Sequence, residues 1–177
     1  MEIRKLRDGD DLLAVSRVYE ESWRGAYRGL MPQEYLDSLP AGNWVPYLEQ
    51  AGRESLILLD GDSIIGAAGC CAGRVPELSG WGEIASIYLL PEYWGKGWGK
   101  LLFSAAVEQL EAMGYRDLFL WVLEENQRAR AFDERMGFRP SETYREDEIG
   151  GRIVREIQYR RMAPRNHDGS LPKEVIS

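Results

Sequence analysis

The sequence of 177 residues is poor in the side chains that metal and histidine chemistry require. Its only histidine, His167, lies in a polar stretch near the C-terminus, so histidine-based catalysis and histidine-rich metal sites are not expected. The only two cysteines, Cys70 and Cys71, are neighbours in an apolar run. Successive side chains of a strand point to opposite faces, so we expect two reduced core residues and no metal site.

Long apolar runs and basic clusters are also missing. No stretch is long and apolar enough to span a membrane, and the N-terminal MEIRKL lacks the apolar core of a signal peptide, so we expect a cytoplasmic protein without a membrane partner. A net charge of −7 without a basic stripe argues against a nucleic-acid partner and weakly favours a cationic one, such as an amine. The length and a hydrophobic content of 44% fit one globular domain.

The most informative stretch is the glycine-rich segment PEYWGKGWGK, residues 91–100. Residues 84–90 before it form an apolar run typical of a strand. After it, apolar side chains recur at three- and four-residue spacing as far as Met113, which is typical of a helix. Alternate glycines let a ligand approach the backbone closely. The unpaired N–H groups at a helix start attract phosphate, and Lys96 and Lys100 add positive charge.

The loop matches neither of two common nucleotide-binding patterns. GxxxxGK[ST] is absent, and GxGxxG fails because Leu102 stands where its third glycine belongs, which disfavours a nucleotide-dependent kinase or NTPase. The remaining pattern, xxGxG after a strand and Pro-Glu-Tyr, resembles the pyrophosphate loop of the GNAT superfamily of acyl-CoA-dependent N-acetyltransferases. Its glycines are Gly97 and Gly99 here, and Trp94 replaces the usual Gln or Arg.

The remaining segments follow the order of the GNAT fold. A first helix is expected after a cap at Asp8 or Asp10, ending near Trp23, and the pairs 61–62 and 150–151 predict tight hairpins. We expect further helices at 33–38, 43–50, 98–113 and 126–136, and strands at 2–6, 55–60, 63–71, 83–90, 118–123, 138–148 and 152–161.

The resemblance covers residues 1–162 and also rests on the segment NxxAxxF…GF at 126–138. It implies an α/β (α+β) fold with a mixed, mostly antiparallel sheet of about seven strands. A central parallel pair of strands splays apart, and helices cover both faces. The polar tail, 163–177, is expected to be partly disordered.

The resemblance also implies an acetyl-CoA site. The pantetheine arm would lie along the backbone of Ile87, Tyr88 and Leu89. Asn126 would reach the pantetheine or the thioester, or would only cap the helix, and Phe132 is expected in the core. The pyrophosphate would lie on Gly95, Lys96, Gly97, Trp98, Gly99 and Lys100.

Amide formation requires a base for the amine, stabilisation of the thioester oxygen and departure of the thiolate. Some family members use a glutamate at the position of Glu83 as general base; the alternative is a solvated carboxylate at a strand end. Glu124 and Glu125 are the second choice, or serve only as charges at a helix N-terminus. A backbone N–H near Leu89 is expected to polarise the thioester.

Protonation of the thiolate is where the sequence departs from the family. Many members have a tyrosine seven residues after the position of Asn126 as general acid, and here that residue is Asp133. Either burial raises the pKa of Asp133, or water or another group, for example Tyr144, supplies the proton. No cysteine is placed for a covalent intermediate, so direct attack in a ternary complex is expected.

The acceptor pocket is expected from the N-terminal helices and the final hairpin. Trp23, Tyr27 and Arg28 are its candidate lining, although they could instead pack the first helix on the sheet. Arg24 or Arg28 could orient a carboxylate or phosphate of the acceptor. The edges of the final hairpin are compatible with a homodimer.

These inferences predict an N-acetyltransferase that moves acetyl from acetyl-CoA to a primary amine, with a small molecule favoured. A protein N-terminus or lysine is the alternative acceptor. A non-catalytic acyl-CoA sensor is the alternative from another class, and Asp133 is the feature that favours it.

Overall fold

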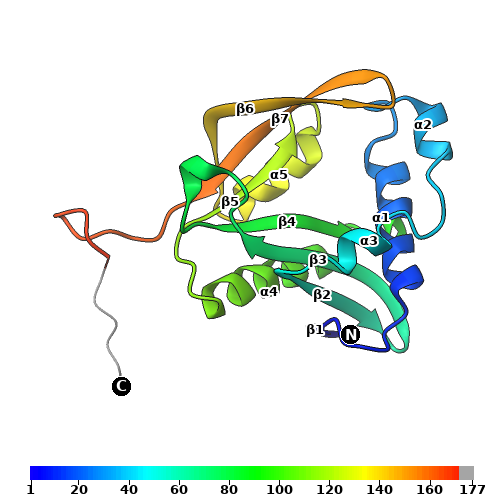
Figure 1. Cartoon of the computed structure of the whole chain (residues 1–177), viewed down its shortest axis with the longest axis horizontal. Helices are drawn as coiled ribbons and strands as arrows, with labels where there is room; N and C mark the ends of the chain where they lie inside the picture. Colours follow the sequence, from blue (N-terminus) through cyan, green and yellow to red (C-terminus); the bar gives the residue numbers. More distant parts are fainter. Residues whose placement is uncertain (172–177) are drawn as a thin grey trace.

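The computed structural model describes residues 1–171. Its seven strands form one sheet in the order β1-β2-β3-β4-β5-β7-β6, in which only β4 and β5 run parallel. The predicted sheet and its central parallel pair are confirmed (Figure 1). The strands are β1 (Glu2–Lys5), β2 (Arg53–Asp60), β3 (Ser63–Ala72), β4 (Gly82–Leu89), β5 (Leu118–Leu123), β6 (Arg139–Ile149) and β7 (Arg152–Arg161).

Five α-helices accompany the sheet in the described part of the chain. Cys70 faces α4, with its Sγ 3.6 Å from the carbonyl oxygen of Ala106. A side chain at the neighbouring Gly69 would instead meet Tyr47 of α3, so α4 and α3 cover opposite faces of the sheet. The helices are α1 (Leu12–Ala26), α2 (Gln33–Asp37), α3 (Val45–Leu48), α4 (Trp98–Ala112) and α5 (Gln127–Arg135), with short 3₁₀ turns at Pro76–Leu78 and Pro91–Tyr93.

The start of α1 corrects one prediction. Asp11 caps the helix, because its Oδ1 accepts hydrogen bonds from the N–H groups of Leu13 and Ala14. Asp10 is instead held by the guanidinium of Arg4, with two bonds of 2.8 Å that lower the pKa of its carboxyl to about 2. Asp8 makes no cap either, and the helix runs on to Ala26 rather than ending near Trp23.

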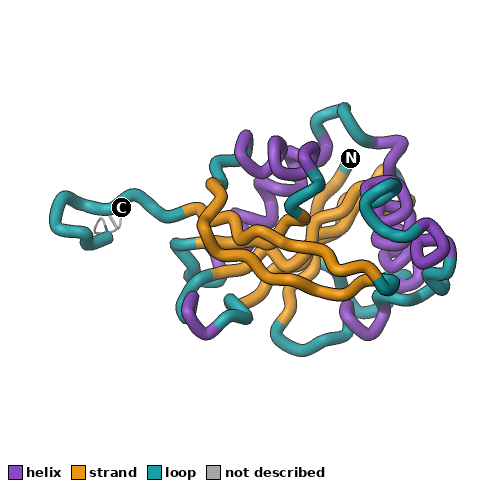
Figure 2. The backbone as a smooth tube through the Cα atoms, turned by 90° about the horizontal axis from the view of Figure 1, so that it is seen from above, coloured by secondary structure: helices purple, strands orange, loops and turns teal. Residues whose placement is uncertain are grey.

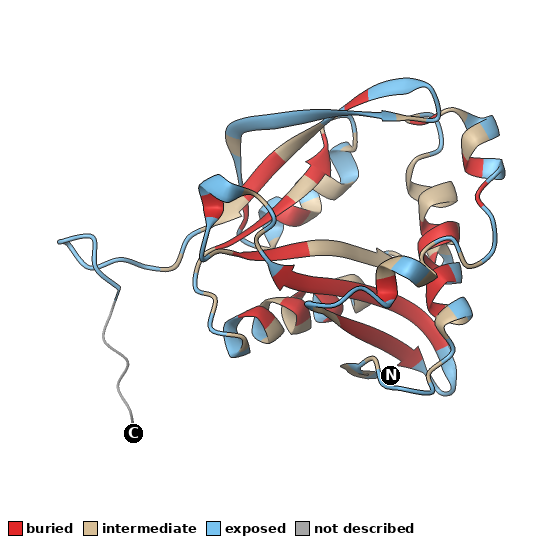
Figure 3. Ribbon diagram, in the orientation of Figure 1, coloured by how far each residue is buried: buried red, intermediate tan, exposed pale blue. Residues whose placement is uncertain are grey.

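The main core lies between the sheet and α1 on one side and α4 on the other, where β2 and β3 are almost wholly buried (Figure 3). Leu102, Ala106 and Leu110 form the buried face of α4, as its apolar spacing predicts. Leu101 belongs to that spacing but is 51% exposed. Phe103 occupies the core instead, edge-on to Phe138 with ring centroids 5.4 Å apart.

A bulge in β4 opens the centre of the sheet. Between the pairs Gly69↔Ser86 and Cys70↔Ile84, β4 contains one residue more than β3. On its other side β4 pairs with β5 only at Gly82↔Leu118 and Glu83↔Phe119. The two parallel strands therefore separate beyond this point, and a cleft opens between them.

The hairpin of β6 and β7 lies beyond β5 and extends along the molecule to the end formed by α1 and α2 (Figures 1 and 2). After β7 the chain is tied down briefly, because Ala163 N–H and the Arg165 guanidinium both bond to the carboxylate of Asp117. The predicted disorder of the tail partly concerns residues 172–177, which lie outside the described residues. Within residues 1–171, no helix has the length and apolar character needed to cross a membrane.

Candidate active site

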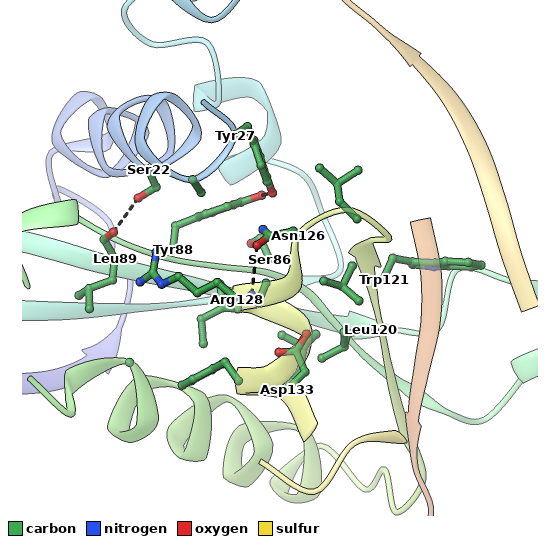
Figure 4. Close-up of a pocket in the computed structure, with 18 of the residues that line it drawn as sticks. Ser22, Tyr27, Ser86, Tyr88, Leu89, Leu120, Trp121, Asn126, Arg128 and Asp133 are labelled. Atoms are coloured by element: carbon green, nitrogen blue, oxygen red, sulfur yellow. Dashed lines mark hydrogen bonds between the residues drawn. The ribbon is translucent and has the colours of Figure 1, made fainter. Parts of the chain in front are cut away.

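One cleft of about 1090 Å³ lies where β4 and β5 separate. Its walls come from α1, β4, the glycine loop, the start of α4, β5, α5 and the final hairpin. Figure 4 shows side chains from α1, β4, β5 and α5 converging on this space. Most of the residues predicted to bind CoA or to take part in catalysis line it.

The glycine loop forms the outer end of the cleft. Gly95 and Gly97 have positive φ angles of 73° and 86°, which other residues rarely adopt, and Gly97 directly precedes α4. Gly95, Gly97, Gly99 and Lys100 line the cleft. Because no side chain caps the start of α4, its first N–H groups are available to a phosphate.

Two predicted loop residues point elsewhere. The ammonium of Lys96 donates to the carbonyl of Glu92 at 2.8 Å and does not line the cleft. Trp98 packs against the hydrophobic core and does not line the cleft either. Lys96 and Trp98 can therefore contribute only backbone groups to a phosphate site in this loop.

The edge of β4 shows which backbone groups face the cleft. Leu90 N–H donates to Ile65 of β3, so by alternation Tyr88 also turns its N–H to β3. Ile87 and Leu89 then turn theirs to the opposite edge, toward the cleft. Of the three residues predicted to contact pantetheine, these two turn backbone groups to the cleft, whereas Tyr88 lines it with its side chain (Figure 4).

Arg128 is a cleft residue that the sequence analysis missed. The indole N–H of Trp94 donates to the carbonyl of Leu89 at 2.7 Å, and the Arg128 guanidinium stacks 3.7 Å from the centre of the Trp94 ring. Arg128 lines the cleft, where desolvation lowers the pKa of its guanidinium. Trp94 occupies the position of the family's Gln or Arg, and a cation from α5 lies on it. The sequence feature that could have predicted this contact is an arginine two residues after Asn126, in the first turn of the helix that was expected to border the CoA site.

Helix α5 and its N-cap place a carboxyl and an amide in the cleft. Asn126 caps the helix, with its Oδ1 3.1 Å from the N–H of Ala129, and also lines the cleft. Its amide N–H groups therefore remain for a ligand. Asp133 is 5% exposed, and burial, with a smaller effect of Glu134, raises the pKa of its carboxyl to about 7. Phe132 packs edge-on to Phe103 and also lines the cleft.

Glu83 lies in the same cleft but is only 1% exposed, so the alternative of a solvated strand-end carboxylate is wrong. Arg74 donates to both of its oxygens, from Nη2 to Oε1 at 2.7 Å and from Nε to Oε2 at 3.0 Å. The backbone N–H of Arg74 adds a third bond at 3.1 Å. Glu83 is therefore a fixed, ion-paired carboxylate on the cleft wall.

The second-choice catalytic residues lie outside the cleft lining. Glu124 and Glu125 pair with Arg155 and Arg152 of β7, at 3.9 and 3.2 Å. Tyr144 is 55% exposed, and the Arg155 guanidinium stacks on its ring. None of the three contributes a side chain to the cleft wall.

Aromatic side chains line the part of the cleft predicted to take the acceptor, here called the acceptor side. Trp23 of α1 and Tyr27, which follows the helix as its C-cap, contact each other with ring centroids 4.9 Å apart. The hydroxyl oxygens of Tyr27 and Tyr88 are 3.5 Å apart. Both predicted aromatic residues line the cleft, and Trp23 also packs on Trp44, so the two interpretations of Trp23 hold together. Trp121 of β5 adds a further ring to the lining.

The predicted arginines do not reach this space. Arg28 is exposed and does not line the cleft. Arg24 is used inside the fold, because its guanidinium donates to the carbonyls of Leu36 and Leu39 at 3.2 and 2.9 Å. The arginines that do line the acceptor side are Arg74 and Arg145, each paired with a glutamate.

The turn of the final hairpin contacts α2 next to the acceptor side. A β-carbon at Gly150, in the hairpin turn, would lie 2.6 Å from the Cβ of Tyr35 in α2, so backbone and helix touch. Ile149 and Val154 next to the turn join a second hydrophobic cluster with Leu36 of α2 and Leu123 of β5. The hairpin and α2 therefore meet beside this end of the cleft, which Ile149 lines (Figure 1).

Comparison with known proteins places this geometry in a family. The model of the Acetyltransferase (GNAT) family matches residues 13–138, so the chain belongs to that family. The chain is 28% identical to the spermidine N(1)-acetyltransferase of Thermoplasma acidophilum, over 90% of this chain and 98% of that protein. It is 37% identical to the [ribosomal protein bS18]-alanine N-acetyltransferase of Haemophilus influenzae, over 48% and 53%.

A solved structure agrees with these sequence matches. The PaiA N-acetyltransferase of Thermoplasma acidophilum, in complex with coenzyme A, superposes with a TM-score of 0.68 at 26% identity, over 88% of this chain and 96% of that one. The chain is thus an acyltransferase of the GNAT family with acetyl-CoA as its co-substrate. Within residues 1–171, no three His, Cys, Asp or Glu side chains are grouped as a metal ion would need.

Proposed function

We propose that this enzyme acetylates a small primary amine, by direct attack of the amine on acetyl-CoA. The observation that carries the proposal is the acceptor side, next to which the hairpin turn at Gly150 touches Tyr35 of α2. A peptide needs an open groove, whereas a small amine fits a pocket with aromatic walls. Similarity over nearly the whole length of a spermidine acetyltransferase supports this choice over a protein acceptor.

The donor is held by backbone groups and a few cations. The pyrophosphate lies on the N–H groups at the start of α4, with Lys100 and Arg128 supplying positive charge. The pantetheine arm extends from there along β4 and pairs with the cleft-facing edge at Ile87 and Leu89. This arrangement carries the thioester from the glycine loop toward the bulge in β4.

The carboxylate of Glu83 accepts the proton of the acceptor ammonium. Since Arg74 already bonds both of its oxygens, the proton travels through a water molecule rather than by direct contact. The amine nitrogen then forms a bond to the carbonyl carbon and releases its second proton through the same water to solvent, and the C–S bond breaks. The backbone N–H of Ile87, next to the bulge, stabilises the charge that develops on the carbonyl oxygen.

Asp133 protonates the departing thiolate. A carboxyl with a pKa of about 7 is largely protonated at slightly acidic pH and half protonated near neutrality, so it can donate. This answers the objection that an aspartate in the family's tyrosine position favours a non-catalytic sensor. Because burial raises the pKa of Asp133, the aspartate can act as a neutral acid in place of the tyrosine.

The test is an acceptor panel with a thiol-release readout. The panel contains spermidine and shorter diamines, amino acids, an aminoglycoside, and a peptide with an N-terminal alanine. We expect release of CoA with at least one small amine and little with the peptide. Faster turnover of the peptide would assign a protein acceptor, and acetyl-CoA binding without turnover of any amine would restore the sensor alternative.

Assembly and boundaries extend the proposal. We propose residues 1–162 as the catalytic unit and a homodimer formed through β6, whose outer edge ends the sheet and is largely exposed. Light scattering after size-exclusion chromatography tests the dimer. A monomer at the protein concentration of the activity assay would contradict it.

The cytoplasmic location stays a prediction.

A further inference from the structure

Ser86 lies in the bulge of β4 and lines the cleft. Two tyrosines from helices packed on the sheet reach its hydroxyl. The hydroxyl of Tyr19 in α1 lies 2.8 Å from Ser86 Oγ, and the hydroxyl of Tyr47 in α3 donates to the same oxygen at 3.1 Å. Three hydroxyl groups from distant parts of the chain thus meet at one point on the cleft wall. None of them belongs to the mechanism above.

The direction of these bonds follows from counting protons. Tyr19 is fully buried, and Ser86 is the partner that the structure gives its hydroxyl. If Ser86 donated to Tyr19, the Tyr19 proton would be buried without an acceptor, which is costly. Tyr19 therefore donates to Ser86, as Tyr47 does. Ser86 Oγ then accepts two hydrogen bonds, and its own O–H is left to point into the cleft it lines.

Two features of the backbone accommodate this arrangement. A β-carbon at Gly69 of β3 would lie 2.8 Å from Ser86 Oγ and 2.9 Å from the Tyr47 hydroxyl oxygen, so only glycine leaves room for both groups. The bulge places Ser86 on the same face as Tyr88 and Glu83, at the point where β4 leaves β5. The hydroxyl is therefore positioned by the fold rather than left on a mobile surface.

We propose that the Ser86 hydroxyl is a catalytic hydrogen-bond donor to the carbonyl oxygen of the acetyl thioester. The proposal rests on the acetyl transfer proposed above. An arm that runs along β4 from the glycine loop brings its thioester to the bulge, where the N–H of Ile87 and the O–H of the neighbouring Ser86 both face the cleft. Two donors aimed at one oxygen are the usual composition of an oxyanion hole.

Ser86 transfers no proton in this role. The amine nitrogen bonds to the carbonyl carbon, the carbonyl π electrons move to oxygen, and the Ser86 O–H stabilises that negative charge. When the C–S bond breaks, the electrons return and the hydrogen bond weakens again. Tyr19 and Tyr47 are positioning residues, because by donating to Ser86 Oγ they orient and polarise its O–H without touching substrate.

The first test is vibrational and needs no amine. The carbonyl band of acetyl-CoA labelled with ¹³C at the acetyl carbonyl is recorded free, and bound to the wild type and to Ser86→Ala and Ser86→Thr. We expect a shift to lower wavenumber in the wild type, a clear loss of that shift in Ser86→Ala, and its retention in Ser86→Thr. Identical bands in the wild type and Ser86→Ala, or no shift in the wild type, would overturn the proposal.

Two more variants protect the test against a folding defect. Tyr47→Phe keeps the serine and removes one orienting donor, and should lose part of the shift. Gly69→Ala displaces the Ser86 and Tyr47 hydroxyls without removing either, and should do the same. If both keep the full wild-type shift, the tyrosines do not orient a donor and the proposal fails.

Kinetics then separates this proposal from the proposed function. With an active amine, Ser86→Ala should lower kcat about 10²-fold with little change in the KM for acetyl-CoA. An unchanged kcat with a raised KM for the amine would show that Ser86 contacts the acceptor, and would overturn its assignment to the thioester. If no amine is turned over, the proposed function fails, whereas the carbonyl band still decides the role of Ser86.

Discussion

Asp133 gives the sharpest quantitative prediction, because the pKa of its carboxyl differs so much between the folded and the unfolded chain. Burial raises the pKa from the ordinary 3.8 to about 7 in the folded protein. Each pKa unit is worth about 1.4 kcal/mol of unfolding free energy. Folding does not disfavour the neutral acid, but it disfavours the carboxylate, so ionisation of Asp133 lowers the free energy of unfolding. This loss of stability is absent below the unfolded pKa of 3.8, grows as the pH rises from there, and is complete above the folded pKa of about 7.

Asp133→Asn mimics the neutral acid at every pH. The variant should match the wild type in strongly acidic solution, exceed it by about 2 kcal/mol at pH 5, and exceed it by about 4 kcal/mol at pH 9. Other titrating groups cancel in the difference between the two proteins. The assay is urea unfolding of the CoA-free proteins, followed by tryptophan fluorescence between pH 5 and 9. The control is Asp62→Asn, an exposed carboxyl in the turn after β2.

The refuting result is a difference between Asp133→Asn and the wild type that does not change with pH. Such a result would mean that Asp133 ionises in the folded protein as readily as in the unfolded chain. The proposed protonation of the thiolate by Asp133 would then fail as well. A parallel response in Asp62→Asn would instead assign the effect to general surface charge.

Four further variants test the remaining site residues. Lys100→Ala should weaken CoA binding about 10-fold in calorimetry, whereas Lys96→Ala, whose ammonium faces away, should change it little; equal losses would contradict the geometry. Gly97→Glu should abolish CoA binding in a folded protein, with Gly97→Ala separating strain from charge, and unchanged affinity would remove the phosphate loop. Arg128→Ala should weaken CoA binding most at low salt, and a loss independent of salt would argue against a phosphate contact. Glu83→Gln should lower turnover most at low pH, where the amine needs a base, and a pH–rate profile of wild-type shape would move that role elsewhere.

Local signals in the sequence predicted much of the fold. Residues 61–62 and 150–151 marked both hairpin turns, and β5 covers the predicted 118–123. Gly114 and Gly137 follow α4 and α5 with φ angles of 97° and 91°, as a helix C-terminus favours. These features depend on a few neighbouring residues, so one sequence is enough to find them.

Contacts between distant segments were not predictable in the same way. The stack of Arg128 on Trp94 and the bonds of Arg74 to Glu83 depend on how α5 and a loop pack beside β4. The prediction of the α1 cap failed for a related reason. Three aspartates in the segment Asp-Gly-Asp-Asp were equivalent candidates for the cap, and Arg4 of the first strand binds one of them, Asp10. Wherever competing side chains are equivalent in sequence, tertiary partners decide between them.

The same distinction explains how the cleft can provide both a base and an acid from carboxyl groups. Glu83 and Asp133 are both buried on the wall of one cleft, yet only Glu83 has a guanidinium on its two oxygens. Asp133 has burial and the nearby charge of Glu134, which raise the pKa of its carboxyl. A carboxylate held by Arg74 suits proton acceptance through water, and a neutral carboxyl suits proton donation to a thiolate. The proposed roles therefore follow from the neighbours of each carboxyl rather than from its residue type, and exchanging the neighbours should exchange the roles.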